Sequence, residues 1–234
     1  MKRLDGRIAI VTGASRGIGA AVAVQYAKEG AHVILVARTV GGLEEVDDQV
    51  TAAGGSATLV PLDLIDGPAI DRLGGSVAER WGRLDILVGN AAMLGNVGPV
   101  GHHAPEDWER AFTINVTANW RLIRAFDALL RASDAGRAIF VTSKAAVLNR
   151  AYLSLYGSSK AALEAMVKTY AAEVEKTTLR VNLLDPGPTR TSMRAQLMPG
   201  EDQNILPVPE QIAPLFVDMA DPAFESNGQV ISFV

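Results

Sequence analysis

Tyr156 and Lys160 are four residues apart in a segment that predicts a helix over about 154–176. Residues at i and i+4 share one helix face, so the phenol and the amine can reach the same ligand. Leu163 and Val167 continue this face as an apolar stripe, which desolvates the ammonium, and its charge favours the ionised phenol. The pair therefore predicts a tyrosine that donates and accepts a proton near neutral pH.

Ser143 adds a hydroxyl close to this pair. It follows an apolar run at 137–142, which predicts a strand, and precedes Tyr156 by 13 residues. We expect this hydroxyl to hold a substrate carbonyl beside the phenol. The next residue, Lys144, leads to the hypothesis that an anionic or carrier-linked substrate is favoured near the site; the alternative is a surface charge without a role.

A glycine-rich turn lies near the N-terminus, where Thr12 to Gly19 read Thr-Gly-Ala-Ser-Arg-Gly-Ile-Gly between an apolar run and a predicted helix at 17–29. Gly13, Gly17 and Gly19 carry no Cβ atom, so a pyrophosphate can approach the backbone amides and the positive end of the helix dipole. The spacing differs from the G-x-G-x-x-G of the general dinucleotide fingerprint. A tight turn without a ligand therefore remains the alternative.

Two arginines indicate which nucleotide would bind. An acidic residue at the end of the second strand would bond the ribose hydroxyls of NAD, whereas this chain has Arg38 there. Arg16 lies inside the glycine turn, and a guanidinium matches phosphate oxygens in a planar, bidentate way. We therefore predict NADP rather than NAD; the alternative is that both arginines are solvated surface charges.

Asn115 lies on the apolar stripe of a helix predicted over about 105–131. A buried amide must be hydrogen-bonded, to a water or to a distorted backbone turn. Asn119 shares the stripe, so periodicity alone does not choose between the two asparagines.

The elements that must position these residues alternate along the chain. Strands are expected at 8–11, 32–37, 57–62, 84–88, 137–142, 179–184 and 229–233, and further helices at 42–53, 66–81 and 209–220. Alternation of this kind predicts a Rossmann-type doubly wound parallel sheet of about seven strands in a three-layer α/β/α architecture. Ligands of such folds bind beyond the carboxyl ends of the strands. Gly13, Arg38, Asp63, Asn90, Ser143 and the run from Pro186 to Thr191 all fall there.

Length and composition narrow the class of protein. We expect one domain over residues 1–234. The net charge of -4 argues against nucleic acid as a partner, and the chain contains no cysteine for disulfides or thiol chemistry. No signal-peptide core and no apolar run long enough to span a bilayer is present, so we expect a cytoplasmic protein without a membrane partner.

In chain order, these motifs resemble the short-chain dehydrogenase/reductase family, and in particular its 3-oxoacyl-carrier-protein reductase branch. The resemblance extends from Arg7 to about Phe233. The matching motifs are Thr12-Gly13-Ala-Ser-Arg-Gly17-Ile-Gly19, Asp63, Asn90-Ala91, Asn115, Ser143, Tyr156-Gly-Ser-Ser-Lys160 and Pro186-Gly187-Pro-Thr-Arg-Thr191. The chain departs from the family pattern at Gly89 and Ala92 of Gly89-Asn90-Ala91-Ala92, at Asp185 and at Thr189.

The resemblance implies an enzyme that interconverts a ketone and a secondary alcohol by hydride transfer, with Tyr156 as the general acid or base. It selects Asn115 over Asn119 and assigns Asn115 a water-mediated proton relay through Lys160, so that the catalytic set is Asn115, Ser143, Tyr156 and Lys160. The resemblance also implies a set of residues that contact the cofactor. Together with Arg16 and Arg38, which were argued above, the set is Gly13, Ser15, Arg16, Gly17, Ile18, Gly19, Arg38, Asp63, Leu64, Asn90, Ala91, Tyr156, Lys160, Pro186, Gly187, Thr189 and Thr191.

The resemblance further implies a homodimer or homotetramer and a small-molecule carbonyl or alcohol substrate, which is acyl-carrier-linked in some relatives. The substrate loop at about 191–209 mixes apolar with charged residues, which suits closure over an apolar chain, and another role is the alternative. The alternative function is a non-catalytic NADP(H)-binding redox sensor or regulator on the same fold.

Two further groups of residues are expected to be solvated surface. His102 and His103 are adjacent in a loop bounded by glycine and proline, without a further ligand that would indicate a metal site. The arginines of the long helix are expected to form its solvated face, with docking of an acyl carrier as the alternative; they are Arg110, Arg121, Arg124 and Arg131.

Overall fold

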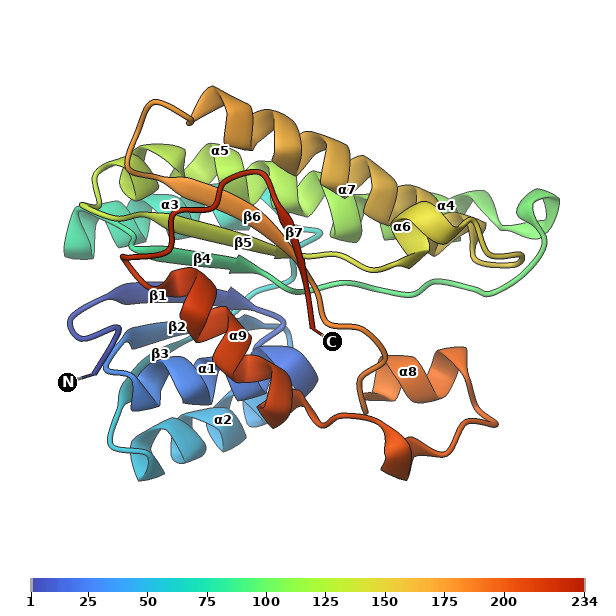
Figure 1. Cartoon of the computed structure of the whole chain (residues 1–234), viewed down its shortest axis with the longest axis horizontal. Helices are drawn as coiled ribbons and strands as arrows, with labels where there is room; N and C mark the ends of the chain where they lie inside the picture. Colours follow the sequence, from blue (N-terminus) through green and yellow to red (C-terminus); the bar gives the residue numbers. More distant parts are fainter. Residues whose placement is uncertain (1, 234) are drawn as a thin grey trace.

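Seven parallel strands form one sheet in the computed structural model, which describes residues 2–233 (Figure 1). The strands lie in the order β3-β2-β1-β4-β5-β6-β7. Their bounds are β1 Ile8–Thr12, β2 His32–Ala37, β3 Ser56–Pro61, β4 Ile86–Gly89, β5 Arg137–Val141, β6 Arg180–Asp185 and β7 Val230–Ser232. The central strands are almost continuous apolar runs because helices cover both of their faces. The predicted Rossmann-type sheet and its three layers are confirmed.

Two helical layers enclose this sheet. One layer comprises α1 Gly17–Lys28, α2 Val40–Ala52 and α9 Pro209–Ala220, and the other comprises α3 Gly67–Trp81, α5 Ala118–Arg131 and α7 Ser154–Glu173 (Figure 1). Each layer buries its own apolar cluster against the sheet, with Tyr26 and Phe216 in the first and Phe126 and Phe140 in the second. Among residues 2–233 no helix combines the length and the apolar character needed to cross a bilayer.

The strand order reverses between β1 and β4. From β1 the chain builds outward to β2 and β3, and it then returns to place β4 on the opposite side of β1. Because the loops that follow β1 and β4 run to opposite helical layers, they leave a crevice at the carboxyl ends of the two strands. This reversal places the glycine-rich turn next to the loop after β4.

The predicted long helix over 105–131 is interrupted, which corrects the expectation of a single helix. It consists of α4 Pro105–Phe112, the π-helix η2 Thr113–Thr117 and α5. A π turn inserts one extra residue and rotates the helix that follows. The buried stripe of α5 runs through Leu122, Phe126 and Leu130, while Leu129 is only half-buried.

Segments expected to be loops contain short helices. Between β5 and α7 lies α6 Ala145–Leu148, and the segment at 191–209 contains α8 Ser192–Leu197 and the short 3-10 helix η3 Gln203–Ile205. A further 3-10 turn, η1 Val100–His102, precedes α4. Strand ends differ from the prediction where a polar or small residue continues the ladder: Asp185 pairs with Ser232, and Gly89 pairs with Phe140.

The arginines of α5 are not simply solvated. Arg121 and Arg124 place guanidinium nitrogens 3.3 and 3.8 Å from a carboxylate oxygen of Asp71 on α3. Arg131 pairs with Asp127 one turn earlier, at 2.8 Å. Of the four arginines, Arg110 on α4 is exposed, and no such ion pair is found for it within residues 2–233. Three of the four predicted surface arginines therefore take part in surface ion pairs, and Arg124 and Arg131 remain exposed as predicted.

Candidate active site

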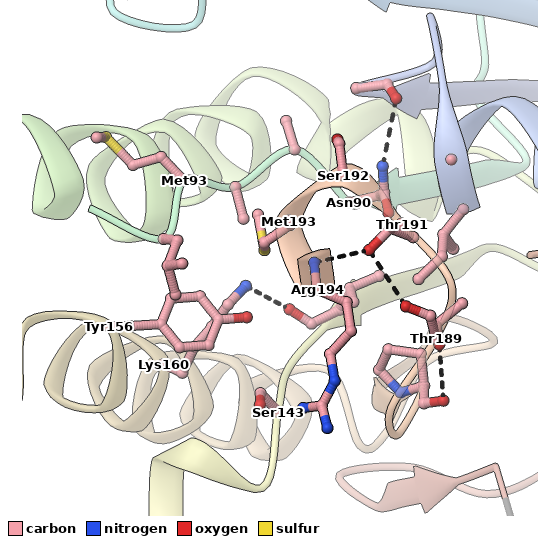
Figure 2. A pocket seen from close by; sticks show the side chains of 18 of the residues that line it. Asn90, Met93, Ser143, Tyr156, Lys160, Thr189, Thr191, Ser192, Met193 and Arg194 are labelled. Atoms are coloured by element: carbon pink, nitrogen blue, oxygen red, sulfur yellow. Dashed lines mark hydrogen bonds between the residues drawn. The ribbon is translucent and has the colours of Figure 1, made fainter. Parts of the chain in front are cut away.

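One cavity of 440 Å³ lies at the carboxyl edge of the sheet, between the loops that follow β1 to β6 and the helices α7 and α8 (Figure 2). The predicted site residues that line it are Gly13, Ser15, Arg16, Gly17, Ile18, Arg38, Asp63, Leu64, Asn90, Ala91, Ser143, Tyr156, Lys160, Pro186, Gly187, Thr189 and Thr191. Two predicted residues, Gly19 and Asn115, do not line it. Six separate strand ends thus contribute to a single cavity.

The turn after β1 has the shape of a phosphate cradle. Gly13 has φ +66°, a conformation that favours glycine, and a Cβ atom on it would lie 2.9 Å from Nδ2 of Asn90. A Cβ atom on Gly19 would collide with the carbonyl oxygen of Gly13, so Gly19 lets α1 pack directly beneath the turn. The N-cap residue of α1, Arg16, makes no side-chain capping bond. The first amides of the helix are therefore available to an anion, which fits a dinucleotide diphosphate.

Thr12 and Asn90 join the two sides of the crevice. The Thr12 hydroxyl donates to the carbonyl of Val88 at 3.1 Å and accepts from the amides of Asn90 and Ala91, at 2.9 and 3.1 Å. The Asn90 side chain donates to the carbonyl of Thr12 at 2.8 Å. Asn90 therefore fixes the end of β4 to the end of β1, and Thr12 is a structural residue whose role the sequence reasoning missed. A threonine that ends a buried strand was the available signal.

The end of the cavity next to β2 carries positive charge. Arg16 and Arg38 are both exposed and line this end, where an acidic residue would be expected for NAD. Asp63 lies nearby, and its carboxylate accepts from the amide of Ile65 at 3.1 Å. The observed arrangement fits a phosphate-bearing ribose better than a free diol.

The opposite end of the cavity holds Tyr156, Lys160 and Ser143 (Figure 2). Tyr156 and Lys160 are 9% and 1% exposed. The Lys160 Nζ donates to the carbonyl oxygen of Val141, the last residue of β5, at 2.8 Å, and lies 5.7 Å from the centre of the Tyr156 ring. The helix α7 is thereby fixed to the strand end that leads to Ser143.

Burial dominates the titration of this pair. It raises the pKa of Tyr156 to about 12, although a hydrogen bond with the Ser143 side chain acts in the opposite direction. It lowers the pKa of Lys160 to about 8, while the nearby Glu164 carboxylate acts to raise it. The expected lowering of the phenol pKa by the neighbouring ammonium is therefore wrong in direction, because burial outweighs it. At pH 7 the phenol retains its proton and is set up as a proton donor.

Asn115 holds the loop after β4 against α7. Its Nδ2 donates to the carbonyl of Met93 and to the hydroxyl of Ser159, both at 2.9 Å, and its Oδ1 accepts from the amide of Met93 at 2.9 Å. Asn119 donates to the backbone carbonyl of Asn115 at 2.9 Å. Asn119 therefore bonds a carbonyl of the distorted π turn, one of the two possibilities that the sequence left open, whereas Asn115 lies within that turn and bonds the loop after β4 and α7. Ser159 was missed as a partner.

The segment after β6 is folded by its own side chains. The Asp185 carboxylate accepts from the amide of Gly187 at 3.1 Å, and the Thr189 hydroxyl lies 3.2 Å from the carbonyls of Pro186 and Gly187. Thr191 caps α8 by accepting from the amide of Arg194 at 3.2 Å (Figure 2). The departures at Asp185 and Thr189 therefore serve turns beside the cavity.

An ion pair closes the segment that follows. The guanidinium of Arg194 bonds both oxygens of Glu201, each at 2.5 Å, and the pair joins α8 to the chain that precedes η3. The predicted substrate loop at 191–209 is therefore a folded flap along one side of the cavity.

His103 is half-buried, which corrects the expectation of a solvated histidine. Its Nε2 lies 2.9 Å from the hydroxyl of Ser154 at the start of α7, whereas His102 is exposed. Within residues 2–233, no three side chains of histidine, cysteine, aspartate or glutamate are grouped so that they could hold a metal ion.

This chain is similar in sequence and in fold to known oxidoreductases. The model of the short chain dehydrogenase family matches residues 7–202. The oxidoreductase YciK of Escherichia coli K12 is 38% identical over 92% of this chain and 86% of its own length. The 2,3-dihydro-2,3-dihydroxybenzoate dehydrogenase of Bacillus subtilis is 34% identical over 86% of this chain and 77% of its own length. A short chain dehydrogenase structure from Shigella flexneri, complexed with NADP, has a TM-score of 0.94 and 36% identity and covers 99% of this chain and 98% of its own.

Replacing Lys160 by methionine should stabilise the protein at pH 7. A pKa lowered from 10.5 to about 8 means that burial of the ammonium lowers the free energy of unfolding of the wild type by about 3 kcal/mol. Methionine removes this cost, and the loss of the hydrogen bond to the Val141 carbonyl offsets part of the gain. We expect urea denaturation to give a free energy of unfolding about 1–3 kcal/mol larger. The difference in free energy of unfolding between the variant and the wild type should shrink as the pH rises from 8 towards 10.5. In this range the unfolded wild-type chain binds more protons than the folded one, so the wild type gains stability as the pH rises.

The matched control is Lys176→Met, which removes an exposed lysine beyond the end of α7. This variant should change the free energy of unfolding by less than about 0.5 kcal/mol. A Lys160→Met protein that is less stable than wild type at pH 7 would contradict the cost assigned to burial.

Proposed function

The chain belongs to the short-chain dehydrogenase/reductase family of NAD(P)-dependent oxidoreductases, and we propose that it interconverts a ketone and a secondary alcohol with NADP as the hydride carrier. The observation that carries the proposal is that Tyr156, Lys160 and Ser143 share one cavity with the glycine turn and the two arginines. The alternative of a non-catalytic sensor is not favoured, because a sensor needs none of these three side chains.

The cofactor is held along the whole crevice in this proposal. The turn from Gly13 to Gly19 receives the diphosphate, Arg16 and Arg38 receive the 2′-phosphate, and the residues around Asp63 contact the adenine. The run from Pro186 to Thr191 faces the nicotinamide end. The structure from Shigella flexneri that is complexed with NADP supports this choice of cofactor. When bound, NADPH supplies the hydride.

In the proposed reaction, side chains of this protein bind the substrate oxygen and supply its proton. Ser143 donates a hydrogen bond that holds the carbonyl oxygen next to Tyr156. Because burial keeps the Tyr156 phenol protonated, it can give its proton to the oxygen as negative charge develops there. Lys160 holds the cofactor ribose and favours the phenolate that remains. Asn115 acts from outside the cavity by fixing the loop after β4.

Positive charge at the far end of the cavity favours an anionic substrate. Lys144, Arg150 and Arg194 line the part of the cavity beyond Ser143 and Tyr156. The two acidic residues among the lining residues are Asp63 after β3 and Asp185 at the end of β6, and Asp185 lies close enough to Tyr156 for its charge to raise the pKa of the phenol. Apolar side chains accompany the cations, namely Met93, Leu94, Leu148, Leu153, Met193 and Leu197. We infer a ketone or alcohol with an apolar body and a carboxylate or phosphate group, under a flap that spans 191–209.

One relative illustrates this chemistry. The substrate named for the Bacillus subtilis relative, 2,3-dihydro-2,3-dihydroxybenzoate, carries a carboxylate. An acyl chain on a carrier would bring a phosphate to the same cations through its phosphopantetheine arm.

Replacing Arg38 by aspartate should change the cofactor preference. The carboxylate repels the 2′-phosphate and bonds a ribose diol, so we expect the ratio of Kd for NAD to Kd for NADP to fall by about tenfold or more. Titration of intrinsic fluorescence with each cofactor measures the ratio. The control is Arg110→Asp, which makes the same charge change at an exposed position on α4. An unchanged ratio in Arg38→Asp would argue against NADP recognition by this residue.

Replacing Tyr156 by phenylalanine should remove turnover and keep the cofactor site. Without the phenol the carbonyl oxygen has no proton donor, so we expect kcat for ketone reduction to fall by about 10²–10⁴-fold. Stopped assays of NADPH oxidation against a ketone panel measure the rate, and fluorescence titration checks that the Kd for NADPH stays within about threefold. Wild-type protein that binds NADPH but reduces no ketone would instead favour the sensor.

Variants of the cationic end should change the preference for anions. We compare kcat/KM for short keto acids with that for their methyl esters. Lys144→Met, Arg150→Met and Arg194→Met should each lower the acid-to-ester ratio by about 5- to 50-fold. Glu201→Gln should raise the ratio because it frees the Arg194 guanidinium. The control is Lys176→Met, an exposed lysine beyond the end of α7. Equal ratios in wild type and all variants would exclude an anion site here.

A further inference from the structure

Glu164 is a buried carboxylate on α7 that the proposed chemistry does not use. It follows Lys160 by one helical turn and is 8% exposed. Its Oε1 accepts from the hydroxyl of Thr142 at 2.8 Å, and its Oε2 accepts from Nζ of Lys168 at 3.1 Å. A buried carboxylate destabilises a protein unless each of its oxygens has a hydrogen-bond partner. Removing one partner is more destabilising than replacing the carboxylate and all of its partners by apolar residues. The burial of Glu164 at this position therefore needs an explanation.

The partner of Glu164 is the residue directly before Ser143. Thr142 is 1% exposed, and its amide donates to the carbonyl of Leu184 on β6 at 2.8 Å. The residue before it, Val141, accepts from Lys160. Two successive residues at the end of β5 are thus bonded by two residues of α7 that are one turn apart. These two bonds set the position of the strand end that carries Ser143 relative to the helix that carries Tyr156.

The same carboxylate is the negative charge that acts on the Lys160 amine. Burial lowers the pKa of Lys160, and Glu164 opposes this shift. The other titratable groups around the amine are Tyr156 on α7 and Asp185 at the end of β6, which lines the same cavity. The end of β5 presents a carbonyl to Lys160, and η2 presents the neutral amide of Asn115 to α7. Lys168 pairs with Glu164 on its outer side and weakens this effect.

We propose that Glu164 is a positioning residue of the active site: through Thr142 it fixes Ser143 against Tyr156, and its charge keeps the Lys160 amine protonated. The inference rests on the function proposed above for these three residues. A carboxylate with a purely structural role would affect the stability of α7 and leave the proton affinity of Lys160 unchanged.

The charge effect is measured on the protein without cofactor and without turnover. Lysine labelled with ¹³C at Cε gives an NMR titration in which Lys160→Met identifies the signal of Lys160. Glu164→Gln keeps an acceptor for Thr142 and removes the charge, so the pKa of Lys160 should fall by about half to one unit. Thr142→Val keeps the carboxylate, and the control Glu173→Gln removes an exposed carboxylate on the same helix. Neither should shift the pKa by more than about 0.2 units.

The positioning effect is measured by the kinetics of NADPH-dependent ketone reduction. Thr142→Val should lower kcat by about tenfold and leave the Kd for NADPH within about twofold, because Ser143 is displaced while the cofactor turn is untouched. Thr142→Ser restores the hydroxyl and should recover kcat. In Glu164→Gln the alkaline limb of the pH profile for reduction should move to lower pH together with the NMR pKa, since the amine loses its proton earlier.

The outcomes separate the two proposals. An unchanged Lys160 titration in Glu164→Gln, or an unchanged kcat in Thr142→Val, overturns the role of Glu164. A wild-type protein that reduces no ketone, while Glu164→Gln still lowers the pKa of Lys160, overturns the proposed function and confirms the electrostatic half of the inference. A shifted pKa together with lower kcat in Thr142→Val and recovery in Thr142→Ser supports both.

Discussion

The burial of one amine against one carbonyl is the constraint on which the site depends. Lys160 is enclosed by α7 and the sheet, and its bond to the Val141 carbonyl, together with the bond between Glu164 and Thr142, fixes where α7 lies along β5. Desolvation makes the ammonium costly, and the same desolvation makes its field strong at the neighbouring phenol. The protein therefore holds an unfavourable group at this point and surrounds it with partners that restrict where it can move.

The crevice beside this amine follows from the topology of the sheet. Because the strand order reverses at β1 and β4, six strand ends deliver residues to one edge, and the bonds between Thr12 and Asn90 keep the two central ends together. The arginines beside β2 lie at one end of the cavity, and the Tyr156 phenol lies at the other. In a sheet of this kind chemistry can change through loop residues while the strands stay the same, which is why the flap after β6 could acquire its own ion pair.

The sequence predicted what depends on period and spacing. Alternating apolar runs predicted the seven strands, and the i, i+4 spacing of Tyr156 and Lys160 predicted their common face. Features that depend on tertiary packing were beyond its reach. The π turn at Thr113–Thr117 has no local signature, and the bond between Thr142 and Glu164 joins residues 22 apart. The direction of the Tyr156 pKa shift was wrong because it depends on how deeply the ring is buried, which periodicity does not reveal.

Gly89 shows how one departure from the family pattern is compensated within the fold. The resemblance implies an asparagine there, yet a Cβ atom on Gly89 would collide with Oδ1 of Asn119 and lie 2.5 Å from the ring of Phe140. Asn119 fills that space from α5, and its amide bonds the carbonyl of Asn115 in the π turn. A side chain at position 89 and the asparagine at 119 therefore exclude one another. Gly89 and Asn119 therefore have to be considered as a pair whose members cannot be exchanged separately.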